Sequence, residues 1–129
     1  MKFTFKITEL THTELTDFLS TALYASFWAS AHYDVSDKEG VEIQSEYDEP
    51  CFEDILASIL LGGKTITIID DEEEKEYKLD LKMLINAFNK VAKSEDYRNH
   101  VWNIINEEYD INDADIVLQF AIFGEEMYA

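Results

Sequence analysis

The sequence predicts an α+β fold in which an antiparallel sheet of about four to five strands carries four to five packed helices. Three observations lead to this class. Apolar and polar residues alternate in several short segments, as in strands with one buried face. Elsewhere apolar residues recur every three to four positions, as in amphipathic helices. The predicted strands come in pairs joined by short loops, and the last third of the chain has a helical pattern throughout.

The chain begins with a predicted strand and a predicted helix. Residues 2–8 alternate strictly between polar and apolar side chains, which is typical of a strand with one buried face. Thr11 and Glu14 then have the spacing of a capping box, and apolar residues follow at helical spacing. We therefore expect a helix over about residues 12–24.

A β-hairpin is predicted next. Residues 25–35 place small and aromatic apolar side chains on one face of a strand, although the same stretch could prolong the preceding helix. The strand is favoured because residues 41–47 also alternate. Residues 36–40 supply a polar loop that ends in glycine, as a hairpin connection requires.

The middle of the chain predicts a helix followed by a second hairpin. Pro50 follows two acidic residues, which is typical of a helix start, and Gly62-Gly63 ends the apolar periodicity after it. Residues 64–69 are rich in β-branched side chains. A run of acidic residues joins them to a second strand at 76–79.

Three helices are predicted to complete the chain. The first covers residues 81–91, and the second is capped by Ser94. The third, over residues 114–123, has only two polar side chains and should lie buried beneath the others. Because no linker or repeat divides the 129 residues, we expect a single compact domain spanning residues 1–129.

Charge gives the main indication of function. The chain has 28 Asp and Glu against 10 Lys and Arg, a formal net charge of −18 at pH 7. Small domains carry a net charge of about 2 to 8 for solubility, and the excess beyond that destabilises the compact state by self-repulsion. A surface this negative repels phosphate backbones and anionic lipids. Direct binding of nucleic acid or membranes is therefore disfavoured, and cationic partners are favoured.

A cytoplasmic protein is expected. Cys51 is the single cysteine, so no internal disulfide can form. The first ten residues lack the basic and apolar regions of a signal peptide. No apolar run approaches the roughly 20 residues that a membrane-spanning helix needs.

The sequence predicts no catalytic site, no cofactor and no metal site. His12, His32 and His100 are far apart and have no zinc-site spacing, and Cys51 has no nucleophile signature around it. Gly62-Gly63-Lys64 resembles a fragment of a phosphate-binding loop, but it lacks the full motif and follows a helix instead of a strand. A histidine, a cysteine and an acid that met in the fold would reopen the enzyme hypothesis.

Two acidic clusters have both a metal and a structural interpretation. Residues 70–74 offer carboxylates to calcium but lack the register of an EF-hand loop, which favours a solvated hairpin tip. Residues 110–115 precede an apolar helix, where capping of its free amides explains their acids better than metal binding. Gln119 is expected to be a buried amide bonded to backbone, and the alternative is a recognition residue facing a groove.

Trp28 is the aromatic residue that we single out for an interface. On the strand interpretation it faces away from Phe27 and Tyr33, among polar neighbours. Tryptophan is enriched at binding hot spots. Trp28 is therefore a candidate for self-association into a homodimer.

The acidic surface is predicted to bind a basic DNA- or RNA-handling protein such as a nuclease or a CRISPR effector. A domain of this size has a diameter of roughly 35 Å, over which duplex DNA carries about 20 charges, comparable with the net charge of the chain. Carboxylates would replace phosphates against the lysines and arginines of the partner. The candidate partner-binding residues are Asp70, Asp71, Glu72, Glu73, Glu74 and Glu76 at the hairpin tip, Glu42, Glu46, Asp48 and Glu49 at and beyond the predicted strand, and Glu107, Glu108 and Asp110.

The C-terminal half resembles small acidic proteins carried by phages and mobile elements. The resemblance rests on the glycine-led strand at 61–68, the acidic run and Tyr77 after it, and a terminal pattern of Asp113-Ala114-Asp115, Gln119, Phe123-Gly124-Glu125 and Tyr128. It implies expression in a host cytoplasm and antagonism of host defence, as in anti-restriction and anti-CRISPR proteins that mimic DNA. It carries over no catalytic or binding residues.

Three functions remain open on the sequence alone. The favoured one is a non-enzymatic inhibitor of a basic nucleic-acid-handling protein. The alternative is a structural or oligomeric accessory domain of a phage or mobile element, and the third is an enzyme or ligand sensor. One contiguous acidic face would favour mimicry. Acids interleaved with lysines would favour the accessory domain, the lysines concerned being Lys75, Lys78, Lys82, Lys90 and Lys93.

Overall fold

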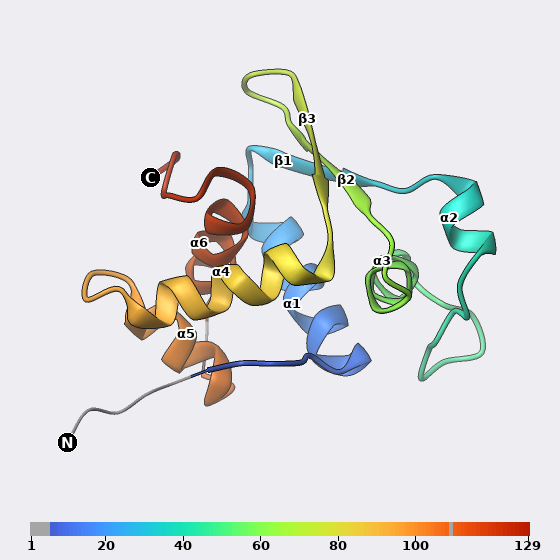
Figure 1. Cartoon of the computed structure of the whole chain (residues 1–129), viewed down its shortest axis with the longest axis horizontal. Helices are drawn as coiled ribbons and strands as arrows, with labels where there is room; N and C mark the ends of the chain where they lie inside the picture. Colours follow the sequence, from blue (N-terminus) through green and yellow to red (C-terminus); the bar gives the residue numbers. More distant parts are fainter. Residues whose placement is uncertain (1–5, 109) are drawn as a thin grey trace.

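The structure is a computed structural model that describes residues 6–108 and 110–129 (Figure 1). It is an α+β fold, as predicted, with a three-stranded antiparallel sheet and six helices in the described residues. The strand and helix numbers match the prediction only roughly. The elements are α1 (His12–Ala25), β1 (Ala29–His32), α2 (Val35–Glu39), α3 (Phe52–Leu61), β2 (Ile66–Asp70), β3 (Lys75–Leu79), α4 (Leu81–Lys93), α5 (Arg98–Ile105) and α6 (Ile111–Phe123).

The sheet has the strand order β1-β2-β3, with β2 in the middle. Ala29 of β1 lies opposite Asp70 of β2, and Ile66 of β2 lies opposite Leu79 of β3. In Figure 1 the sheet lies above α1, α4 and α5, and the β2–β3 hairpin projects beyond them. The predicted second hairpin is thus confirmed, and β1 forms as a shorter strand than the predicted 25–35.

Helix α6 lies at the centre of the helical layer, where it packs against α1, α4 and α5. Its apolar residues Ile116, Val117 and Leu118 are buried, which confirms the predicted buried helix. The helix begins at Ile111 because Asp110 caps it, and it ends at Gly124, whose φ of 76° is the left-handed conformation that glycine adopts readily.

Local signals placed the start of α1 and the end of α3 correctly, but the predicted helix start at Ser94 is wrong: Ser94 is the C-cap of α4, and α5 begins at Arg98 after Tyr97. Thr11 and Glu14 form both hydrogen bonds of the predicted capping box at the start of α1. Helix α3 ends at Leu61 and is followed by Gly62, against which the loop before α3 packs. A Cβ atom added at Gly62 would lie only 2.3 Å from Val41, so that close approach requires a glycine.

The predicted hairpin between residues 25 and 47 is wrong in its second half. Residues 35–39 form the short helix α2 instead of a loop, and residues 41–47 form no strand. Their alternation has another cause: Val41 and Ile43 pack against the core, and the N–H of Gln44 donates to the hydroxyl of Ser58 on α3 (2.9 Å). The segment therefore covers a helix and does not pair with β1.

The predicted first strand, residues 2–8, lies largely outside the described residues, and residues 6–8 form no strand. The backbone of Ile7 hydrogen-bonds to a side chain instead of to a strand. Its N–H donates to Oδ1 of Asn89 on α4 (2.7 Å), and its carbonyl accepts from Nδ2 of the same amide (2.8 Å). One asparagine thus satisfies the backbone groups that a neighbouring strand would otherwise have to bond.

Trp28 is fully buried, with 0% of its surface exposed, so the prediction that it serves self-association is wrong. Its indole N–H donates to Oδ1 of Asp115 (2.8 Å), and its ring lies 5.0 Å from that of Phe123 and 5.8 Å from that of Tyr128. The sequence pattern did not reveal this partner, which is 87 residues away along the chain.

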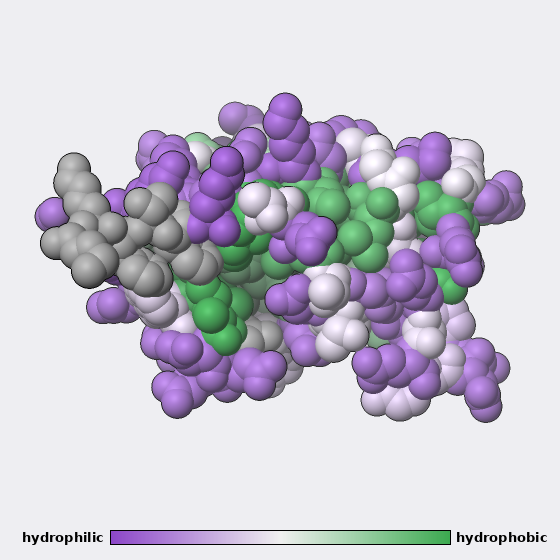
Figure 2. Space-filling view, turned by 60° about the horizontal axis from the view of Figure 1, so that its bottom comes forward, coloured by the Kyte–Doolittle hydropathy of each residue, from purple (hydrophilic) through white to green (hydrophobic). Residues whose placement is uncertain are grey.

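Figure 2 shows that one face of the molecule carries hydrophobic residues along its middle, between hydrophilic ones. A small depression of about 160 Å³ lies between the segment before α1 and helices α1, α4 and α5, with Leu10, Phe18 and Ile104 in its lining.

No helix in the described part of the chain has the length and hydrophobicity that a membrane span requires.

Candidate functional site

The carboxylates are mostly at the surface. Of the 28, 21 are exposed, four are half-buried (Asp37, Glu53, Asp80 and Asp115) and three are buried (Asp54, Asp70 and Asp113). The ion pairs among the described residues involve histidines only. No described lysine or arginine lies within 4.0 Å of a carboxylate oxygen, so the exposed acids keep their charge available to another molecule.

The tip of the β2–β3 hairpin presents four exposed acids at residues 71–74, with Glu76 exposed behind them. Asp70 does not belong with them. It is only 1% exposed, and one of its carboxylate oxygens accepts from the backbone N–H groups of Glu72 (3.0 Å) and Glu73 (3.2 Å). The prediction that Asp70 contacts a partner is thus corrected: it holds the tip in shape.

Tyr128 joins the hairpin tip to the C-terminal segment. Its hydroxyl donates to the carboxylate of Asp70, with distances of 2.8 and 3.0 Å to the two oxygens. Desolvation, then the bond to Asp70, and then the charges of Glu73 and Glu72 raise the pKa of Tyr128 to about 12. The tip carboxylates therefore act electrostatically on the C-terminal segment.

Gln119 holds the same segment against α6. The side chain is fully buried and makes four hydrogen bonds, as predicted mainly to backbone. Its Oε1 accepts from the N–H groups of Met127 and Tyr128 (2.8 Å each), and its Nε2 donates to the carbonyl of Tyr128 (2.9 Å) and to Asp115. The C-terminal segment therefore lies at a defined place beside the hairpin.

The loop between α4 and α5 adjoins the C-terminal segment on its other side. The hydroxyl of Tyr97 donates to Glu126 (3.3 Å). The pKa of Tyr97 is raised by the charge of Glu126 first, and also by those of Asp96 and Glu125. In Figure 1 the C-terminal segment lies between this loop and the hairpin tip.

Three chain segments thus meet in one acidic region, which we call the acidic edge. Its nine exposed carboxylates are those of Asp71, Glu72, Glu73, Glu74, Glu76, Glu95, Asp96, Glu125 and Glu126. The region is not exclusively acidic. Lys75 lies within the hairpin, and Nζ of Lys90 donates to the carbonyl of Gly124 (2.7 Å).

The predicted acids do not all lie on this edge. Residues 42–49 belong to the connection between α2 and α3, which in Figure 1 lies at the opposite end of the molecule from the C-terminal segment. Glu107, Glu108 and Asp110 lie between α5 and α6, where Asp110 caps α6. The edge also includes acids that the sequence pattern did not indicate, because only the fold brings their positions beside the hairpin: Glu95, Asp96, Glu125 and Glu126.

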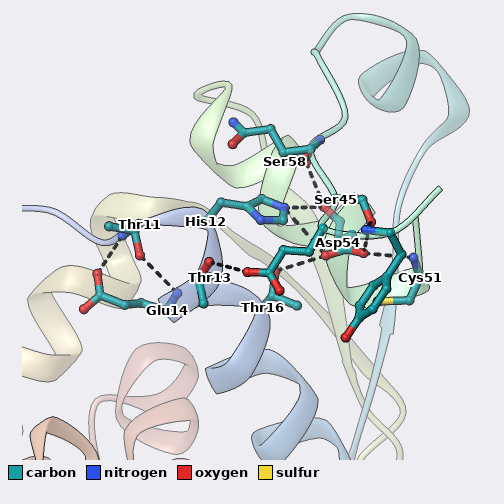
Figure 3. A network of polar contacts seen from close by, with 12 residues as sticks. Thr11, His12, Thr13, Glu14, Thr16, Ser45, Cys51, Asp54 and Ser58 are labelled. Carbon is teal, nitrogen blue, oxygen red and sulfur yellow. Dashed lines mark hydrogen bonds and ion pairs between the residues drawn. The ribbon is translucent and has the colours of Figure 1, made fainter. Parts of the chain in front are cut away.

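A histidine, a cysteine and an acid do meet, at a second place (Figure 3). Asp54 on α3 is 5% exposed and accepts from the N–H of Cys51 (3.0 Å) and from the hydroxyl of Ser45 (3.0 Å). Nε2 of His12 on α1 lies 3.3 Å from the backbone oxygen of Asp54 and 3.9 Å from its carboxylate. His12, Cys51 and Asp54 belong to the lining of a cavity of about 110 Å³.

The electrostatics of this cluster favour a structural role. Desolvation raises the pKa of the Cys51 thiol above its ordinary value, which favours the protonated form, a poor nucleophile. Burial opposes ionisation of Asp54, but the hydrogen bonds from Cys51 and Ser45 outweigh burial, and the pKa of Asp54 is lowered. An ionised Asp54 therefore ties the loop before α3 to the start of that helix.

The other two histidines lie elsewhere. Nδ1 of His100 on α5 is 2.6 Å from the buried carboxylate of Asp113, which also accepts from the amide of Asn103 and the N–H of Asp110. Asp113 and Asp110 form the capping box of α6, which agrees with the predicted capping role. His32 is exposed at the end of β1. Among the described residues, no group of three or more His, Cys, Asp or Glu is placed to hold a metal ion.

Comparison of the chain with protein-family models, curated proteins and solved structures finds no match. The resemblance to small acidic proteins of mobile elements therefore stays a prediction.

Proposed function

We propose that the chain is a non-enzymatic binding protein whose acidic edge binds a basic protein that handles DNA or RNA, and that it inhibits this partner. The observation that carries the proposal is the acidic edge itself, nine exposed carboxylates from three segments without a lysine or arginine partner among the described residues. The proposed setting is a cytoplasm, with a defence nuclease or CRISPR effector as the target class.

The electrostatic environment of two tyrosines supports the choice of this edge. Tyr97 and Tyr128 both lie on it, and carboxylates are among the causes that raise the pKa of each. A negative potential that opposes ionisation of a phenol also attracts ammonium and guanidinium groups. A partner with a basic groove would therefore be steered toward this side of the molecule.

Competition with nucleic acid follows from charge and shape. The hairpin projects from the body of the molecule, so its tip is able to enter a groove that accommodates a phosphate backbone (Figure 1). Carboxylates there would occupy the lysines and arginines that otherwise bind phosphates. Binding of this kind weakens as salt screens the charges.

The test is capture of binding proteins from a host lysate at low and moderate salt, followed by elution with duplex DNA and mass spectrometry. The variant Glu72→Gln/Glu73→Gln/Glu74→Gln removes three charges from the acidic edge. Its matched control, Glu42→Gln/Glu46→Gln/Glu49→Gln, removes three charges from the connection before α3.

We expect the unmodified chain and the control to retain a nucleic-acid-handling protein that DNA displaces, and the edge variant to lose it. Equal loss in both variants would mean that only the net charge matters. Capture of no such protein at moderate salt would contradict the proposal and favour an accessory domain.

A further inference from the structure

Strand β1 leaves one edge of the sheet open. It pairs with β2 on one side, and none of the described strands pairs with it on the other. The N–H of Asp71 donates to the carbonyl of Trp28 (2.7 Å), which fixes the alternation of the β1–β2 hydrogen bonds. With Ala29 opposite Asp70, the main-chain groups of Ser30 and His32 face β2. Those of Ala31 face outward.

The two edges of the sheet differ in protection. Strand β3 forms one edge and has the sequence Lys-Glu-Tyr-Lys-Leu. Charged side chains of this kind discourage another strand from pairing there. Strand β1 forms the opposite edge and has the sequence Ala-Ser-Ala-His, without a lysine or an acid. Strand β1 is therefore the edge at which strand addition meets the smaller barrier.

An open depression of about 430 Å³ lies beside β1, between α1 and the start of α3. Ala29 and Ala31 of β1 belong to its lining, and their small side chains occupy little of the space. Two aromatic residues flank it, Tyr24 with 85% of its surface exposed and Phe52 with 41%. Glu53 contributes a carboxylate to the same lining.

We propose that the open edge of β1 binds an extended segment of the basic partner by strand addition, with a lysine or arginine side chain in this depression. Main-chain groups of the segment would pair with those of Ala31. Tyr24 and Phe52 offer aromatic faces to a cation and to its apolar stem, and Glu53 offers the opposite charge. The inference rests on the proposed function for the basic nature of the partner.

Charge decides which occupant fits this edge. A second copy would bring another net charge of −18 toward the first, and the two would repel each other. A basic segment meets Glu53 on one face of the strand. It also meets Asp71, whose carboxylate accepts from the hydroxyl of Ser30 (3.1 Å), near the other face.

The probe is a short, fluorescently labelled peptide of alternating lysine and valine with blocked ends, whose binding is followed by anisotropy. Strand addition uses the N–H of every second peptide residue only. We therefore compare a peptide N-methylated at its lysines with one N-methylated at its valines. One of them should bind about tenfold more weakly, and the other should match the parent. Equal affinity of all three peptides would overturn the inference, because charge alone would then explain binding.

Two proline variants test the same point on the protein side. Ala31→Pro removes an outward-facing N–H from β1, and its matched control, Lys78→Pro, removes the equivalent group from the open edge of β3. Ala31→Pro should weaken binding of the parent peptide by about tenfold, and Lys78→Pro should not. Circular dichroism checks that both variants fold, and the N-methylated peptides decide the matter if either does not.

Failure of this inference is separable from failure of the proposed function. The variant Glu72→Gln/Glu73→Gln/Glu74→Gln should still bind the peptide at β1 while losing the captured protein. If Ala31→Pro captures that protein as the unmodified chain does, strand addition is refuted and the acidic edge stands. A concentration-dependent dimer that Ala31→Pro abolishes in sedimentation would also overturn the inference, because the edge would then belong to a second copy.

Discussion

The buried carboxylates and the acidic edge put the same chemical group to opposite uses. Asp54, Asp70 and Asp113 are each surrounded by donors from their own chain, so their charge is compensated inside the fold. The nine acids of the acidic edge have no cationic partner in the described part of the chain. The 28 acidic residues behind the net charge of −18 therefore comprise a few structural acids and many that are available for binding.

The largest effect on stability is expected from removing one of the three buried carboxylates. Asp113→Ala leaves the side chains of His100 and Asn103 and the N–H of Asp110 without their acceptor. Losing several charge-assisted hydrogen bonds should lower the free energy of unfolding by about 3 kcal/mol. Urea denaturation measures this change. Glu107→Ala, at an exposed position nearby, should change it by less than about 0.5 kcal/mol, and equal effects would erase the distinction.

An intermediate effect is expected where the two regions meet, at the bond between Tyr128 and Asp70. Tyr128→Phe removes this bond and should lower the melting temperature by roughly 4 °C. Folding raises the pKa of Tyr128 to about 12. The contribution of the protonated hydroxyl to the stability of the fold is therefore fully present below the ordinary pKa of 10.0. The contribution is then lost as the pH rises from about 10 to about 12.

The measurement is a series of thermal melts between neutral pH and pH 12. The unmodified chain should lose stability relative to Tyr128→Phe in the alkaline range, and the two curves should converge there. If the melting temperatures of the two proteins instead differ by the same amount at every pH, ionisation of Tyr128 is not linked to the stability of the fold.

The smallest effect on stability is expected at the acidic edge. Glu72→Gln/Glu73→Gln/Glu74→Gln removes three like charges, so the free energy of unfolding should stay constant or rise by less than about 0.5 kcal/mol. Urea denaturation at low and high salt checks this, and salt should reduce any gain. A marked loss of stability would place these acids with the buried ones.

Features that depend on neighbouring residues could be predicted from the sequence. The capping box at Thr11 and Glu14, the helix stop at Gly62-Gly63, the second hairpin and the apolar helix α6 all follow from patterns within a few positions. Each such pattern carries its own physical cause, such as an orphan amide or a required backbone angle. Ser94 is an exception, because its local pattern suits a helix start but the residue is the C-cap of α4, and α5 begins only at Arg98.

Features that depend on distant partners could not be predicted. Residues 41–47 alternate because they cover α3, and the same alternation would suit a strand. Trp28 is buried by residues near the other end of the sequence. The hairpin acids could be identified as a cluster, but Glu95, Asp96, Glu125 and Glu126 join them only through tertiary contacts such as that of Tyr128 with Asp70.

The central place of α6 has a consequence for synthesis on the ribosome. Trp28 and Ser26 hydrogen-bond to Asp115, 87 and 89 residues later, and α1 packs against α6. These early segments therefore stay without their core partner until α6 has left the exit tunnel. Folding of these segments should accordingly be completed after translation of α6 and not progressively, which leaves Trp28 accessible to chaperones until then.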